Sequence, residues 1–219
     1  MAKKSTTKSS PTSAARGADA GALRVQAIVG PELFLHAERT RAIKAALKAE
    51  HGEFDTVRFD GESADAAAVL DECRTFGLMI THKLVIVDAA DKFVNAATRP
   101  MLERYVGDPS PSATLVLRSI HAWVPGKLGE ALQGAEAYFK CDPLKEGELP
   151  AFIAERARTA HGVTVELEGV QILIERLGSD MAKIDSELAK LAAGLAQGAK
   201  GEAAPIVTAK HVRGMVGHD

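Results

Sequence analysis

Aromatic side chains make up only 5% of the 219 residues, and the formal net charge at pH 7 is only −2. Proteins that bind nucleic acid on their own usually combine a basic surface with aromatic rings on which the bases stack. The composition therefore argues against a base-stacking platform and against a global basic field. Residues 1–22 carry three lysines and one arginine but no apolar core, which predicts a disordered, weakly basic tail.

The sequence also lacks membrane and secretion signals. No apolar run approaches the roughly 20 residues that a membrane-spanning helix needs, and no apolar central region marks a secretory signal near the N-terminus. The two cysteines, Cys73 and Cys141, lie far apart and form no C-x-x-C pair. A reduced compartment fits this cysteine usage best. We expect a cytoplasmic protein with no membrane partner.

Five short apolar or β-branched runs are typical of strands. The run from Leu84 to Val87 is continuously apolar, as in a central parallel strand covered on both faces. Segments with helical spacing separate the runs, and we expect Ser63 to cap one helix and Pro100 to restart another. Strands alternating with helices predict a doubly wound, parallel five-stranded α/β sheet. The predicted strands are residues 24–29, 54–59, 83–87, 114–117 and 137–141.

The pattern changes near Asp142. From there the sequence predicts three or four helices, including segments 146–160, 167–177 and 180–195, with Ser179 and Thr208 as caps. The expected organisation is therefore a tail (1–22), an α/β domain (23–141) and a small all-helical domain (142–219).

A sheet of this class often binds nucleotides at the carboxyl ends of its strands. The first turn, Gly30-Pro31-Glu32, has neither the Gly-Lys-Ser/Thr of a P-loop nor a second glycine, and Pro31 removes an N–H. Asp88 ends the third strand without an acidic neighbour, so we interpret it as a helix cap. The histidines show no metal-ligand spacing. We expect no nucleotide, no metal, no other cofactor and no catalytic residue.

A degenerate P-loop ATPase or a receiver-like phosphorylation switch is the alternative from a different class. In a receiver, Asp88 would accept phosphate and Lys140, after the fifth strand, would be its partner. That interpretation needs an acidic pair after the first strand to bind Mg²⁺, and only Glu32 is available there.

An apolar triplet stands where a surface connection is expected. Leu78, Met79 and Ile80 separate the second predicted helix from the third strand. Connections run over the surface, so apolar residues there need a reason. Either the triplet folds back into the core or it is offered to a partner, and the residues alone favour neither.

A set of motifs in one order resembles the delta subunit of the bacterial DNA polymerase III clamp loader, from about residue 23 to the end. Met79 departs from the family, which most often has Phe there. The sequence ends where the family's third, helical collar domain would begin. The matching motifs are Gly30-Pro31-Glu32-Leu33-Phe34-Leu35, Thr75-Phe76-Gly77-Leu78-Met79 before Lys83-Leu84-Val85-Ile86-Val87, Leu102-Glu103-Arg104-Tyr105-Val106 with Pro109 and Leu115-Val116-Leu117, Cys141-Asp142-Pro143-Leu144, Glu187-Leu188-Ala189-Lys190-Leu191, and Val207-Thr208-Ala209-Lys210-His211-Val212.

This resemblance implies an AAA+-like sheet followed by a helical lid. It further implies a non-catalytic subunit that binds the ring-shaped sliding clamp and helps open it for loading onto primed DNA during replication. Leu78 and Met79 would insert into an apolar pocket of the clamp. The implied partners are the sliding clamp, the other clamp-loader subunits and, through the assembled complex, DNA.

Overall fold

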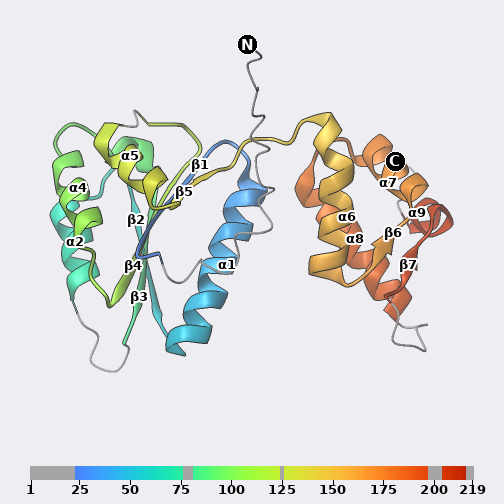
Figure 1. The fold of residues 1–219 in the computed structure, drawn as a ribbon, viewed down its shortest axis with the longest axis horizontal. Helices are drawn as coiled ribbons and strands as arrows, with labels where there is room; N and C mark the ends of the chain where they lie inside the picture. Colours follow the sequence, from blue (N-terminus) through green and yellow to red (C-terminus); the bar gives the residue numbers. More distant parts are fainter. Residues whose placement is uncertain (1–22, 76–80, 124–125, 197–203, 216–219) are drawn as a thin grey trace, which may run out of the picture. The chain divides into compact units, whose positions relative to one another are not determined.

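The computed structural model describes residues 23–75, 81–123, 126–196 and 204–215, and Figure 1 shows their fold. The predicted tail and the triplet Leu78-Met79-Ile80 lie outside the described residues. Two compact units are present, the first ending at Asp142 and the second beginning at Pro143. In the described ranges, no helix has both the length and the apolar character to cross a membrane.

The first unit is built on a five-stranded sheet whose strand pairs are all parallel, as predicted. The spatial order is β2-β3-β4-β1-β5. Strand β1 pairs with β4 from Val25–Leu115 to Val29–Ser119, and β3 pairs with β4 from Lys83–Ala113 to Val87–Leu117. The strands are β1 (Val25–Val29), β2 (Asp55–Asp60), β3 (Lys83–Asp88), β4 (Ala113–Ser119) and β5 (Tyr138–Lys140).

Alternating side chains of the central strands supply the core on each face of the sheet, because successive strand residues point to opposite faces. Val85 and Val87 belong to the core formed with α2, α3, α4 and α5, whereas Leu84 and Ile86 belong to the core under α1. Figure 1 shows α1 on one side of the sheet and α2, α4 and α5 on the other. These helices are α1 (Leu33–His51), α2 (Ala66–Arg74), α3 (Ala90–Phe93), α4 (Arg99–Gly107) and α5 (Gly126–Gly134).

Two expected caps are wrong in this unit. Helix α2 begins at Ala66, and the Asp65 side chain accepts a hydrogen bond from the Ala68 amide. Ser63 instead lies in the preceding turn, where its amide donates to the Asp60 carbonyl. Asp88 caps no helix, because residue 89 takes that position for α3. Pro100 is in the first turn of α4, so the predicted helix restart is confirmed.

The second unit is a helical bundle with its own apolar core. Its α7 has the predicted bounds, and Asp180 rather than Ser179 bonds to the first turn of α8, at the Lys183 amide. The sequence pattern gave no sign of a short parallel pair, Thr164–Val165 (β6) with Ile206–Val207 (β7). The remaining elements are η2 (Glu146–Glu148), α6 (Leu149–His161), α7 (Leu167–Leu177), α8 (Met181–Ala196) and α9 (Ala209–Met215).

Candidate functional site

The carboxyl edge of the sheet is closed at the turn where a nucleotide phosphate would bind. The Glu32 carboxylate accepts a hydrogen bond from the Phe34 amide at 3.0 Å, and the Glu32 amide donates to the Cys141 carbonyl at 2.9 Å. A helix N-terminus attracts an anion through its unpaired N–H groups. Here the protein's own carboxylate occupies that position, and its negative charge repels a phosphate.

Gly30 keeps this turn tight against β5. Its φ is +140°, and a Cβ atom there would lie 2.3 Å from the Cys141 carbonyl oxygen. The Gly30 carbonyl contacts the His36 ring, Nε2 to O at 2.8 Å. The backbone of the turn is therefore in direct contact with the backbone at Cys141, which follows β5.

Asp88 forms an ion pair with an arginine of the neighbouring strand. The Arg118 guanidinium on the neighbouring strand β4 donates to the Asp88 carboxylate from Nε at 2.7 Å and approaches it from Nη2 at 2.5 Å. Arg118 also reaches the Thr40 hydroxyl of α1 at 3.4 Å. Within the residues that the structure describes, no three His, Cys, Asp or Glu side chains gather in a group that could hold a metal ion.

The receiver alternative does not fit this strand order. Asp88 is on β3 and Lys140 on β5, with β4 and β1 between them. Three inter-strand spacings put the two backbones roughly 14 Å apart, too far for a Lys that must contact a phosphate on Asp88. Receiver-type sheets have the order 2-1-3-4-5 instead.

Neither cysteine is available as a nucleophile. Burial is the largest cause that raises the pKa of Cys73 to about 11 and the pKa of Cys141 to about 12. Both thiols therefore stay protonated at neutral pH, and a thiol attacks only as the thiolate.

The amino edge of the sheet holds the other candidate. Residues 76–80 connect α2 to β3, and the described residues on either side of them are firmly held. The amide and hydroxyl of Thr75 both donate to the Asp71 carbonyl, at 2.9 and 2.7 Å. Lys83 Nζ donates to the Glu72 carboxylate at 2.6 Å, which ties the start of β3 to α2. The described residues on both sides of residues 76–80 are therefore held in place by the rest of the first unit.

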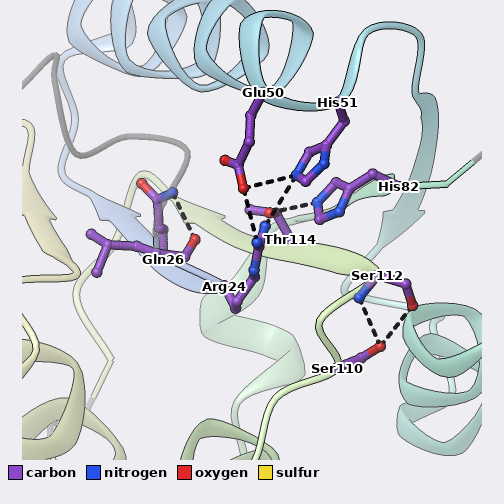
Figure 2. Close-up of polar contacts among 9 residues, drawn as sticks. Arg24, Gln26, Glu50, His51, His82, Ser110, Ser112 and Thr114 are labelled. Atoms are coloured by element: carbon purple, nitrogen blue, oxygen red, sulfur yellow. Dashed lines mark hydrogen bonds and ion pairs between the residues drawn. The ribbon is translucent and has the colours of Figure 1, made fainter.

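A histidine pair lies beside that connection, and the spacing of the histidines in the sequence did not predict it. The rings of His51 and His82 stack at 4.1 Å between centroids. His82 Nε2 lies 3.0 Å from the Thr114 hydroxyl, Arg24 Nη1 lies 3.4 Å from His51 Nε2, and Glu50 pairs with Arg24 at 3.2 Å. Figure 2 shows these side chains converging from α1 and the starts of three strands.

Burial, followed by the neighbouring His51 and Arg24, lowers the pKa of His82 to about 4, and Glu50 opposes the shift. An unfolded histidine has a pKa near 6.5, so the unfolded chain binds more protons between these two values. The contribution of neutral His82 to stability is therefore complete above about pH 6.5 and is lost as the pH falls toward 4.

In the wild-type chain, protonation of His82 lowers the free energy of unfolding by as much as about 3 kcal/mol between pH 6.5 and 4. We expect His82→Asn to remove this loss, so that the free energy of unfolding depends less on pH. The measurement is urea unfolding at several values between pH 7 and 4, read as the difference between variant and wild type. His121→Asn is the control, because His121 is exposed. An unchanged pH slope in His82→Asn would contradict the assignment.

Comparison with known proteins points to one family. The family model described as "DNA polymerase III, delta subunit" matches residues 27–132. The Bacillus subtilis DNA clamp loader delta protein (YqeN) has a similar structure, with a TM-score of 0.71 and 22% identity over 88% of this chain and 58% of that one. Two Thermotoga maritima RuvB variants align with TM-scores of 0.45 and 0.42 at 14% and 15% identity, over 86% and 87% of this chain and 60% of theirs. No curated protein matches.

The likeness to the Bacillus protein bears out the α/β fold with its helical second unit. The chain spans 58% of the length of the Bacillus protein.

Proposed function

Because this chain belongs to the DNA polymerase III delta-subunit family, we propose that it is a non-catalytic clamp-loader subunit. It binds the ring-shaped sliding clamp and helps open it for loading onto primed DNA. The match over residues 27–132 carries this proposal, because it includes the connection between α2 and β3. Leu78 and Met79 of that connection are the residues that insert into the clamp.

The location of the connection supports this role. The described residues on either side of it, the end of α2 and the start of β3, lie at the amino edge of the sheet, away from the closed turn at Gly30. Full burial of a leucine and a methionine in a partner's pocket contributes roughly 3 to 6 kcal/mol before entropic costs. Methionine is flexible enough to fill an irregular pocket.

The carboxyl edge supports the non-catalytic part of the proposal. With the Glu32 carboxylate at the helix N-terminus and Asp88 paired to Arg118, this chain has no phosphate cradle and no free carboxylate for Mg²⁺ at that turn. In this proposal, ATP acts on neighbouring subunits. The other loader subunits, and DNA through the assembled complex, are the further partners of a cytoplasmic protein.

The test has two arms, both with the full chain. Biolayer interferometry with the organism's own sliding clamp should give saturable binding, and calorimetry with ATP and Mg²⁺ should give no heat of binding. Micromolar, Mg²⁺-dependent ATP binding would favour the degenerate ATPase instead. Absence of clamp binding would refute the proposed role.

A further inference from the structure

A hollow of about 330 Å³ lies between α2 and α4. Its lining is mixed: Leu70 and Met101 provide the apolar part, and Arg74, Arg104 and Asp108 the charged part. Helices α2 and α4 lie on the same side of the sheet (Figure 1). The hollow therefore offers an apolar contact and several charges to one ligand.

The two arginines of the hollow differ from most of the other arginines that the structure describes. Among the described residues, neither Arg74 nor Arg104 has a carboxylate within ion-pair distance. Arg74 lies over the Tyr105 ring at 5.8 Å, and Arg104 Nε donates to the Pro100 carbonyl of its own helix at 3.3 Å. Six other arginines do pair with carboxylates: Arg24, Arg41, Arg118, Arg156, Arg158 and Arg213.

A guanidinium has five N–H donors in a fork that fits a carboxylate. The contacts above leave donors of Arg74 and Arg104 available for an outside acceptor. Asp108 lines the same hollow but makes no ion pair with either arginine there, so two positive charges face one negative charge. Charge complementarity therefore favours an acidic ligand.

The hollow is close in sequence to the proposed clamp contact. Arg74 is the last residue of α2, and Leu78 follows four residues later. Four residues span at most about 13 Å. A partner seated on Leu78 and Met79 is therefore close enough to reach Arg74 with its own neighbouring surface.

We propose that the hollow formed by Leu70, Arg74, Met101 and Arg104 binds an acidic segment of the sliding clamp, with carboxylates on the arginine pair and an apolar side chain against Leu70 and Met101. This inference rests on the proposed function. A nucleic-acid strand fits the hollow less well, because the lining contains no described aromatic ring on which a base could stack.

The test is the double variant Arg74→Gln and Arg104→Gln, measured with the sliding clamp by biolayer interferometry at several salt concentrations. We expect a roughly tenfold loss of affinity at low salt and a weaker dependence of affinity on salt, since screening acts on the charges that the variant removes. Arg58→Gln, on the exposed side of β2, is the control and should bind like the wild type. Melting curves should be unchanged in both variants.

The outcomes separate this inference from the proposed function. Loss of binding in a Leu78→Ala and Met79→Ala variant, with wild-type affinity and salt dependence in the arginine variant, would overturn the inference and leave the function standing. Wild-type binding by the alanine variant would instead refute the proposed contact. Fluorescence anisotropy with primed DNA adds a third reading: a loss of DNA binding in the arginine variant, with clamp affinity retained, would also overturn the acidic-segment assignment.

Discussion

Replacing Leu78 and Met79 together by alanine should abolish binding to the sliding clamp and leave the free energy of unfolding nearly unchanged. The proposed burial of both side chains in the clamp would contribute roughly 3 to 6 kcal/mol before entropic costs, and each 1.4 kcal/mol corresponds to a tenfold change in affinity. We therefore expect a loss of at least about a hundredfold. A clamp-binding curve and a urea unfolding curve of the same variant measure the two quantities.

Two controls make this result specific. Leu84→Ala truncates a fully buried leucine of β3 and should lose roughly 2 to 5 kcal/mol of stability. Leu33→Ala truncates a leucine that is 65% exposed and should change neither measurement. If the Leu78/Met79 variant unfolds as easily as Leu84→Ala while its clamp affinity persists, the pair belongs to the core and the proposed contact is refuted.

The departure from the family at Met79 supplies the opposite test. Met79→Phe restores the residue that the family most often has, so it should strengthen clamp binding. Failure to do so would indicate that the clamp's pocket has changed to suit methionine.

The second large effect is expected at Gly30, where alanine should destabilise the first unit by about 3 kcal/mol or more. A Cβ atom would lie 2.3 Å from the Cys141 carbonyl oxygen, so the turn and β5 must separate. That separation breaks the hydrogen bond from the Glu32 amide to Cys141, in addition to the cost of a left-handed φ in a residue with a side chain. Urea unfolding measures the loss.

Two other glycines divide this effect into its parts. Gly52 has a φ of +75°, but no atom lies within 4 Å of the place where a Cβ would stand, so Gly52→Ala reports the conformational cost alone, about 1 to 3 kcal/mol. Gly107→Ala has neither positive φ nor a close neighbour and should stay within about 1 kcal/mol of the wild type. If Gly30→Ala costs no more than Gly52→Ala, the close approach of the turn to Cys141 is not what closes this edge.

Local sequence patterns were sufficient to predict the strands of the sheet and most helices. They were insufficient to predict contacts between residues that lie far apart in the sequence. The run Leu84–Val87 predicted a central strand because a strand that is buried on both faces has apolar residues at every position, without polar residues in alternation. Asp88 looked like a cap because its partner, Arg118, follows 30 residues later on the adjacent strand, and strand order is not readable from spacing. The pair β6–β7 joins two-residue strands about 40 residues apart, too short for any periodicity.

The candidate site shows the same limit. Leu78 and Met79 stood out in the sequence because they are apolar residues in a connection. Arg74 and Arg104 did not, since each is an ordinary arginine on the polar side of its own helix. Only the packing of α2 beside α4 brings them to one hollow. The stacking of His51 on His82 likewise depends on where α1 ends relative to β3.

The strand order also sets the sequence of events during synthesis and folding. β1 lies between β4 and β5, so Val25 first meets its neighbour Leu115 after 90 further residues have been made. Strands β2, β3 and β4 are joined by shorter connections and are adjacent in space, which lets them assemble earlier, since closing longer loops costs more entropy. Strand β1 is thus made before the other four strands of its sheet but is among the last of them to be incorporated, and until then its apolar residues are exposed to aggregation.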